Sequence, residues 1–229
     1  MANDQEKQLA AHASLQFVRA GDIVGLGSGS TVAYAVRFLG ERVRAGLKVR
    51  GVATSIQTQS LAVSLEIPLI TLDEVREIDV TIDGTDEFDP ELRLIKGGGG
   101  ALLREKIVAS ASREEIIIAD STKQVSVLGN CPLPVEVIRF AQAVVSKKIS
   151  ALGATVQLRK DRAGEPFVTD EGNHILDCHF AVGRAQAHFH ALALELRLGQ
   201  LLEKWPNGAR VAGARNQPDD VARGPLVGA

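Results

Sequence analysis

Four short segments of this chain combine glycine with hydroxyl, carboxylate or ammonium side chains. Glycine lets a ligand approach the backbone amides closely, hydroxyls and lysines bind anions, and a carboxylate accepts hydrogen bonds or protons. The sequence therefore predicts a site for a small anionic molecule, with proton transfer as one reaction within its reach. The segments are, in chain order, Gly25–Thr31, Asp83–Asp89, Lys96–Lys106 and Asp120–Gln124.

The first segment, Gly25-Leu-Gly-Ser-Gly-Ser-Thr31, lies where a predicted strand gives way to a predicted helix. Free amides at a helix start, together with the hydroxyls of Ser28, Ser30 and Thr31, donate to phosphate oxygens. Ser30 replaces the third glycine of the dinucleotide fingerprint, and no Lys-Ser/Thr pair follows, so the segment is not a nucleotide P-loop. The alternative is a tight turn with a Ser/Thr helix cap.

The second segment, Asp83-Gly-Thr-Asp-Glu-Phe-Asp89, directly follows a predicted strand. Asp83 and Asp86 are three residues apart, and at the crevice end of a sheet they would accept hydrogen bonds from sugar hydroxyls. A divalent cation is a minor alternative, because it needs more closely spaced oxygen ligands than the segment supplies. An ordinary surface turn is also rich in Asp and Gly.

The third segment places four consecutive glycines, Gly97 to Gly100, between Lys96 and a predicted helix. Glycines are costly to order, so we interpret them as bare amides that approach a small ligand, with Lys96 supplying positive charge. Glu105 then falls early in the helix as a candidate base. The alternatives are a flexible linker and a surface carboxylate paired with a neighbouring cation. In the fourth segment Lys123 follows an apolar strand and either closes on a phosphate or belongs to a capped turn.

The elements that must position these segments alternate between strands and helices. Several of the strands are continuous Ile/Val runs, which favours a mostly parallel sheet covered on both faces. The sequence therefore predicts an α/β doubly wound, Rossmann-like core, with ligands at the carboxyl ends of its strands. The expected strands are 22–26, 49–53, 68–71, 78–82, 92–95 and 116–119, and the expected helices are 9–18, 32–39, 55–65 and 101–110.

After Cys131-Pro-Leu-Pro134 the pattern changes to that of a smaller α+β unit. We expect a helix over 140–152, a strand over 155–158, and a hairpin whose strands flank the turn at Asp170–Asn173. The chain is accordingly divided into a Rossmann-like catalytic domain, residues 1–127, and a smaller α+β domain, residues 128–229. No internal repeat or long linker separates the two.

Bulk properties exclude several classes of protein. With 229 residues, 45% hydrophobic and 24% charged, the chain has the composition of a globular protein, and its net charge of -2 predicts no nucleic-acid partner. No apolar stretch approaches the roughly 18 residues of a membrane span, and the polar N-terminus leads into no signal sequence, so we expect a cytoplasmic protein without membrane contact. Cys131 and Cys178 have no metal-ligand spacing and are interpreted as ordinary thiols.

Taken together, the four segments in this order resemble the A-type ribose-5-phosphate isomerase family. The resemblance covers about Leu9 to Phe180 and rests on Gly-x-Gly-Ser-Gly-Ser-Thr, Asp-Gly-Thr-Asp-Glu, Lys-Gly-Gly-Gly-Gly-Ala-Leu-Leu-Arg-Glu-Lys and Ser-Thr-Lys-Gln-Val. The segments 128–137 and 168–179 are similar as well. Ser28 stands where the family often has Thr, which keeps the hydroxyl.

The resemblance implies interconversion of D-ribose 5-phosphate and D-ribulose 5-phosphate through an enediolate, in the non-oxidative pentose phosphate pathway. It also implies a homodimer that binds a small sugar phosphate, with no cofactor and no metal. Glu105 is the implied proton acceptor, assisted by Asp83, Asp86 and Lys96, and burial beside the aspartates is expected to raise its pKa. The implied substrate-binding residues are Ser28, Gly29, Ser30, Thr31, Asp83, Gly84, Thr85, Asp86, Lys96, Gly97, Gly98, Gly99 and Lys123.

Beyond Phe180 the family pattern is not found in the sequence. Residues 181–229 contain no Ile, Thr, Ser or Tyr, so strand propensity is low. Leucines between 194 and 205 suit a helix face, and residues 207–229 are expected to be poorly ordered. We interpret the C-terminus as a divergent or altered-reading-frame tail that leaves sheet edges in the second domain less well covered.

Two rival functions come from other classes of protein. A sugar-phosphate sensor without turnover would need an effector module, and the motifs leave no room for one. An acyl-CoA transferase-like protein with a nucleophilic glutamate would need a longer chain and a CoA site, neither of which is found.

Overall fold

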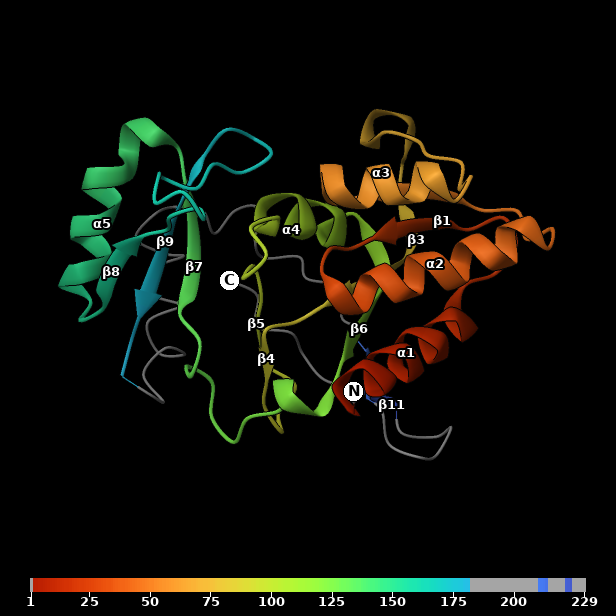
Figure 1. Cartoon of the computed structure of the whole chain (residues 1–229), viewed down its shortest axis with the longest axis horizontal. Coiled ribbons are helices and arrows are strands. Elements are labelled where there is room, and N and C mark those ends of the chain that lie inside the picture. Colours follow the sequence, from red (N-terminus) through yellow and green to blue (C-terminus); the bar gives the residue numbers. More distant parts are fainter. Residues whose placement is uncertain (1, 182–209, 214–220, 224–229) are drawn as a thin grey trace.

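The computed structural model describes residues 2–181, 210–213 and 221–223, which form two units in Figure 1. The larger unit contains a six-stranded sheet in the order β11-β10-β6-β3-β1-β2, and the smaller unit contains a three-stranded sheet in the order β7-β9-β8. A separate two-stranded ladder joins β4 to β5. The strands are β1 (Ile23–Leu26), β2 (Arg50–Ala53), β3 (Ile78–Gly84), β4 (Glu87–Phe88), β5 (Leu94–Ile95), β6 (Ser112–Ala119), β7 (Leu133–Val137), β8 (Thr155–Leu158), β9 (His174–His179), β10 (Arg210–Gly213) and β11 (Val221–Arg223).

The larger sheet is parallel except at one edge. Parallel pairing joins β2 to β1, β1 to β3, β3 to β6 and β6 to β10, and only β11 runs antiparallel to its neighbour. The strands at its centre are buried, and Ile116, Ile117 and Ile118 of β6 are all inaccessible to solvent. The continuous apolar runs therefore mark a sheet covered on both faces, and the predicted α/β class is confirmed.

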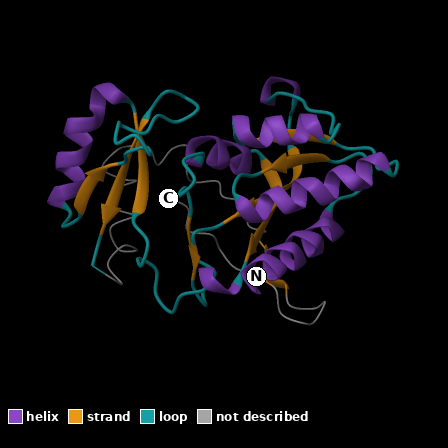
Figure 2. Ribbon diagram, in the orientation of Figure 1, coloured by secondary structure: helices purple, strands orange, loops and turns teal. Residues whose placement is uncertain are grey.

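Helices cover both faces of this sheet (Figure 2). One face packs against two adjacent helices, α1 and α2, whose apolar side chains share a core with Val80 and Ile82 of β3. The other face packs against α4. Among the described residues, no helix is long and apolar enough to cross a bilayer. The helices are α1 (Ala2–Ser14), α2 (Ser30–Arg44), α3 (Ile56–Ser64), α4 (Leu102–Ser110) and α5 (Gln142–Ala151), with 3₁₀ turns η1 (Leu15–Phe17), η2 (Leu72–Glu74), η3 (Ser121–Lys123) and η4 (Arg139–Ala141).

Strand alternation places the polar residues of β3 and β6 on the face that α4 covers. Side chains two apart on a strand point to the same face, so Thr81 and Asp83 lie on the face opposite Val80 and Ile82. Glu115 pairs in register with Thr81 and therefore shares this face. A buried sheet face with two carboxylates is unusual, and it is the face that carries the candidate site.

The strand order also determines where the loops meet. From β1 the chain continues to β2 on one side of the sheet, and from β3 it continues to β6 on the other. Such a reversal opens a crevice at the carboxyl ends of the strands on either side of it. The segments after β1 and β3, which begin at Gly27 and Thr85, therefore lie beside each other.

Two details of the predicted elements are wrong. The predicted strand 68–71 is reduced to an isolated bridge between Leu69 and Gly51. The predicted hairpin around Asp170–Asn173 is a turn, closed by the Gly172 amide on the Thr169 carbonyl, but β9 pairs with β7 and β8 instead of with residues 167–169. Both segments are short, so strand pairing depended on partners outside the segment more than on local propensity.

The C-terminal segment differs more strongly from its prediction. Residues 210–213 and 221–223 are strands of the larger sheet, although the composition of 181–229 predicted few strands. The parallel ladder offered by β6 compensates for weak intrinsic propensity. The helix expected between 194 and 205 lies outside the described residues. The domain boundary at residues 127 and 128 stays a prediction, with the qualification that these two strands belong to the larger sheet.

Candidate active site

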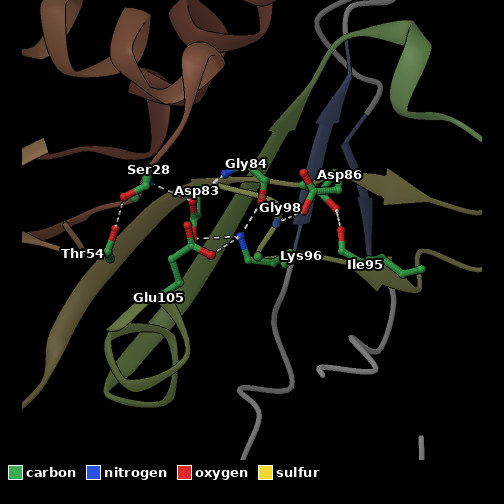
Figure 3. A network of polar contacts seen from close by, with 12 residues as sticks. Ser28, Thr54, Asp83, Gly84, Asp86, Ile95, Lys96, Gly98 and Glu105 are labelled. Carbon is green, nitrogen blue, oxygen red and sulfur yellow. Dashed lines mark hydrogen bonds and ion pairs between the residues drawn. The ribbon is translucent and has the colours of Figure 1, made fainter. Parts of the chain in front are cut away.

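Asp83 joins three of the four polar segments. Its side chain is fully buried near the end of β3, where Oδ1 accepts hydrogen bonds from the amides of Ser28 (3.2 Å) and Gly84 (2.7 Å). Oδ2 accepts a hydrogen bond from Lys96 Nζ at 2.9 Å (Figure 3). Gly27 makes room for this carboxylate, because a Cβ on Gly27 would lie 2.2 Å from Asp83 Oδ1. Asp83 thus fixes the loops after β1, β3 and β5 relative to one another.

Lys96 is held as a cation at the centre of this network. Besides Asp83, its Nζ donates to the Gly84 carbonyl at 2.5 Å and lies 3.5 Å from Glu105 Oε2. Burial alone would lower the pKa of Lys96, but the charges of Asp83, Glu105 and Glu115 outweigh it and raise the pKa. The ammonium group is therefore a fixed positive charge beside the candidate base.

Glu105 lies in the first turn of α4 and is only 6% exposed. Figure 3 shows its carboxylate directed at Lys96 and Asp83. Within the described residues its Oε2 has no hydrogen-bond partner, only the ion pair with Lys96. Burial and the charge of Asp83 raise the pKa of Glu105 to about 7, although Lys96 opposes them. The expected rise in pKa is confirmed, and a carboxylate with this pKa can both take up and release a proton near neutral pH.

Asp86, in the turn after β3, holds the glycine loop, residues 97–100. Its Oδ2 accepts a hydrogen bond from the Gly98 amide at 2.6 Å, and its own amide donates to the Ile95 carbonyl at 2.8 Å. A Cβ on Gly98 would lie 2.5 Å from Asp86 Oδ1, so glycine is required for this approach. Thr85 supports the turn by donating to the Ile95 carbonyl at 2.8 Å.

The start of α2 forms a second, cationic end of the site. Gly29 at the N-cap has φ of 107° and no side-chain cap, so the first amides of α2 remain available to an anion. Lys7 of α1 donates from Nζ to Ser30 Oγ at 3.1 Å. Lys123 of η3 lines the same cavity.

One cavity of about 110 Å³ unites the four segments. Of the predicted site residues only Asp83 and Gly98 are absent from its lining, because Asp83 lies behind Lys96 and the Gly98 amide faces Asp86. It contains both the Glu105–Lys96 pair and the first residues of α2. The lining residues are Ser28, Gly29, Ser30, Thr31, Gly84, Thr85, Asp86, Lys96, Gly97, Gly99, Glu105 and Lys123.

Comparison with known proteins assigns the chain to a family. The model of the family described as ribose 5-phosphate isomerase A (phosphoriboisomerase A) matches residues 50–199. The ribose-5-phosphate isomerase A of Parvibaculum lavamentivorans is 54% identical over 186 residues, which are 79% of this chain and 80% of that protein. The chain belongs to the ribose 5-phosphate isomerase A family.

Solved structures agree with this assignment. A D-ribose-5-phosphate isomerase in complex with phospho-erythronic acid superposes with a TM-score of 0.81 at 34% identity, covering 93% of this chain and 96% of the other. Ribose 5-phosphate isomerase A from Methanocaldococcus jannaschii gives the same TM-score and identity, with 92% and 96% of the two chains covered. The family match continues to residue 199, so the predicted end of the resemblance at Phe180 is too early.

Sequence reasoning missed several groups around the site of this ribose 5-phosphate isomerase A family member. Ser28 Oγ lies 2.9 Å from Thr54 Oγ1 and 2.7 Å from Ser55 Oγ, so its hydroxyl is held by the start of α3. Thr58 adds a hydrogen bond to the Gly27 carbonyl at 2.8 Å. The Thr-Ser pair after β2 was a detectable signal, because it follows a predicted strand at the same sheet edge. Lys7 gave no such signal, since one lysine in a polar helix start is ordinary.

The carboxylates that could bind a metal ion already have protein partners in the described part of the chain. Asp83 is bound to Lys96 and Asp86 to the Gly98 amide, and no group of three or more His, Cys, Asp or Glu side chains is placed to hold a metal. The expectation that the reaction needs no metal stays a prediction, which a chelator can test.

Proposed function

We propose that this chain interconverts D-ribose 5-phosphate and D-ribulose 5-phosphate, with Glu105 as the base that moves the proton. The observation that carries the proposal is the shared cavity of Glu105, Lys96, the glycine loop and the start of α2. A solved relative binds phospho-erythronic acid, a sugar-acid phosphate with an anionic group at each end. The cavity matches such a ligand, since it offers positive charge from Lys96 and Lys123 and the free amides of the α2 start.

The proposed reaction begins on the open-chain aldose. Glu105 removes the proton from C2, the C2–H electron pair forms the C1–C2 double bond, and the carbonyl electrons move to O1. The resulting enediolate is stabilised by Lys96 and the glycine amides, which are in place before charge develops. A proton passes from the O2 hydroxyl to O1, and Glu105 returns its proton to C1, so that O2 becomes the ketose carbonyl.

The two aspartates have different proposed roles. Asp86 lines the cavity, where its carboxylate can accept a hydrogen bond from a sugar hydroxyl or assist ring opening. Asp83 is fully buried behind Lys96 and Ser28 and would act by positioning them. The phosphate is proposed to sit at the start of α2, bound by the amides and hydroxyls of Ser30 and Thr31 together with Lys7 and Lys123.

The test is to incubate the purified protein with ribose 5-phosphate and follow ketose formation, with and without EDTA. We expect turnover that EDTA does not reduce, and a loss on the order of 10²- to 10⁴-fold in kcat for Glu105→Gln at unchanged thermal stability. Glu91→Gln is the matched control, because the Glu91 side chain is 71% exposed. Near wild-type turnover by a folded Glu105→Gln variant would contradict the role of Glu105. Binding of the sugar phosphate without ketose formation would favour the alternative function, a sugar-phosphate sensor without turnover.

We further propose that the protein works in the non-oxidative pentose phosphate pathway of the cytoplasm, as a homodimer. An apolar patch around the start of α5 supports self-association, because Phe140, Ile138 and Val144 are 98%, 58% and 60% exposed in the single chain. A sedimentation experiment on the wild type and Phe140→Ser tests the assembly. A monomeric wild type would contradict it.

A further inference from the structure

Arg159 links the smaller unit to the glycine loop of the candidate site. It directly follows β8, and its Nη1 donates to the carbonyl oxygens of Gly98 at 2.9 Å and Gly97 at 3.3 Å. None of the four polar segments contains it, and it does not line the cavity. These two hydrogen bonds are with the backbone that carries the cavity amides.

The guanidinium group of Arg159 is itself fixed from two sides. Nε and Nη2 bind the two carboxylate oxygens of Asp177 in β9, at 2.9 and 2.5 Å. The ring of Phe167 lies 6.0 Å from the guanidinium carbon, and the Arg159 carbonyl accepts the Phe167 amide at 2.9 Å. The side chains of Arg159 and Asp177 are only 14% and 18% exposed, so this forked ion pair is better shielded than a surface pair.

The glycine loop needs such an anchor because its own conformation is weakly determined. Gly97 and Gly100 have φ of 98° and 89°, and glycine adopts many other backbone angles at little cost. The Gly97 and Gly98 amides are not equally fixed, since only Gly98 is bound by a carboxylate, that of Asp86. Within the described residues no acceptor is found for the Gly99 amide, although Gly99 lines the cavity.

Peptide geometry connects Arg159 to this free amide. The described chain has no cis peptide bond, so the Gly98 carbonyl and the Gly99 N–H point in opposite directions across one planar group. A hydrogen bond that holds the Gly98 carbonyl towards Arg159 therefore turns the Gly99 N–H away from Arg159. Without that bond the peptide between the two glycines is free to rotate.

We propose that Arg159, held by Asp177, is a positioning residue that aims the Gly99 amide at the oxygen on which enediolate charge develops. This inference rests on the proposed isomerase function. It assigns part of the catalytic geometry to the smaller unit, although none of that unit's described side chains lines the cavity. Lysine cannot replace the arginine fully, because a single ammonium group cannot bind the carboxylate as a fork and reach the glycine carbonyls as well.

The experiment measures kcat/KM for ribose 5-phosphate and the binding of phospho-erythronic acid and inorganic phosphate. For Arg159→Met we expect about a 100-fold loss in kcat/KM, chiefly in kcat, and at least a tenfold weaker affinity for phospho-erythronic acid. Inorganic phosphate affinity should not change, because the start of α2 is untouched. Arg159→Lys and Asp177→Asn should show smaller losses, and the Arg159→Met/Asp177→Asn double variant should be no worse than Arg159→Met.

Two controls separate positioning from other effects. Arg162→Met removes an exposed positive charge from the same segment. Glu171→Gln removes a different contact between the units, the ion pair of Glu171 with Arg104 at 2.5 Å. Both should keep wild-type kcat/KM. If Glu171→Gln matches the loss in Arg159→Met, general docking of the smaller unit explains the effect and the proposal is wrong.

Each failure has its own signature. If the wild type makes no ketose but Arg159→Met and Arg159→Lys weaken phospho-erythronic acid binding, the proposed isomerase function is wrong. The proposal that Arg159 positions the glycine loop is then still supported. If the wild type is active, and if the Arg159→Lys and Asp177→Asn variants fold and both keep its kcat/KM and its affinity for phospho-erythronic acid, the positioning role of Arg159 is wrong. These milder variants keep the test decisive should Arg159→Met fail to fold.

Discussion

At the scale of single residues, the charge on Lys96 influences the pH at which Glu105 loses its proton. Burial and Asp83 raise the pKa of Glu105 to about 7, while Lys96 lowers it. Because the deprotonated form is the base, kcat/KM should rise with pH through about 7. In Lys96→Met the opposing cation is lost, so the rise should move to higher pH and the maximum rate should fall on the order of 10²-fold.

The measurement is a pH profile of kcat/KM for both proteins. Ionisation of the substrate phosphate affects them equally and cancels in the comparison. Lys147→Met, at an exposed position on α5, should reproduce the wild-type profile. A Lys96→Met profile that rises at the same pH as the wild type would show that Lys96 does not influence the base.

Glu115 is a buried carboxyl that the proposed reaction does not use. It is fully buried, and neither oxygen has a hydrogen-bond partner among the described residues. Burial raises the pKa of Glu115 to about 8, although Lys96 opposes the rise. The folded protein therefore holds a proton that the unfolded chain releases above about pH 4.5, so this group's contribution to stability is lost as pH rises through about 8.

Replacing Glu115 with Met should therefore stabilise the protein, and more so at pH 8 than at pH 5. The gain should be about 1–3 kcal/mol at pH 8, since an unpaired buried polar group is removed. Urea unfolding at the two pH values measures it. Glu165→Met, at an exposed position, should leave stability unchanged at both. A Glu115→Met variant less stable than the wild type at pH 8 would show that this carboxyl has a partner in solution.

The residues that sequence reasoning found and missed differ in how they act. Ser30, Asp86 and Glu105 belong to compact segments whose composition is unusual in itself. Lys7 and Arg159 contact the site from segments that look ordinary, and their distance from the site in sequence hides these contacts. For such residues only the folded backbone supplies the information.

At the scale of elements, the close approach of β1 to β3 depends on glycine. A Cβ on Gly27 would lie 2.2 Å from Asp83 Oδ1 and 2.7 Å from Asp83 Cα, and backbone cannot easily move aside. Gly27→Ala should cost about 1–3 kcal/mol of stability and also lower activity by displacing Asp83. Thermal unfolding measures the cost. Gly99→Ala, where a Cβ meets nothing within 4 Å, should unfold at the wild-type temperature. Equal melting temperatures for Gly27→Ala and the wild type would contradict the expected clash of the added Cβ with Asp83.

Strongly patterned elements were predictable and weakly patterned ones were not. The Ile run of β6 and the helix after the glycines follow from apolar periodicity alone. The bridge at Leu69 and the pairing of β9 depend on which distant strand offers a free edge. A four-residue strand such as β10, which contains arginine and glycine, carries too little local preference to be recognised.

At the scale of the whole molecule, the two C-terminal strands close one side of the larger sheet. β10 pairs with β6 along Ile116 to Ala119, the most buried strand region of the core. Deleting residues 210–229 should therefore lower the melting temperature and cause light scattering, because β6 becomes an open edge. Removing only 224–229 should change neither. A 210–229 deletion that melts and scatters like the wild type would show that this edge needs no cover.

The pairing of β10 with β6 also affects how the protein is made. Val211 pairs with Ile117, and a ribosome adding ~5–20 residues per second needs about 5 to 20 seconds to travel from one to the other. During that interval the nascent polypeptide presents an apolar, unsatisfied backbone ladder to its surroundings. The unfinished sheet is thus open to misassembly while translation continues, before its last strands have been made.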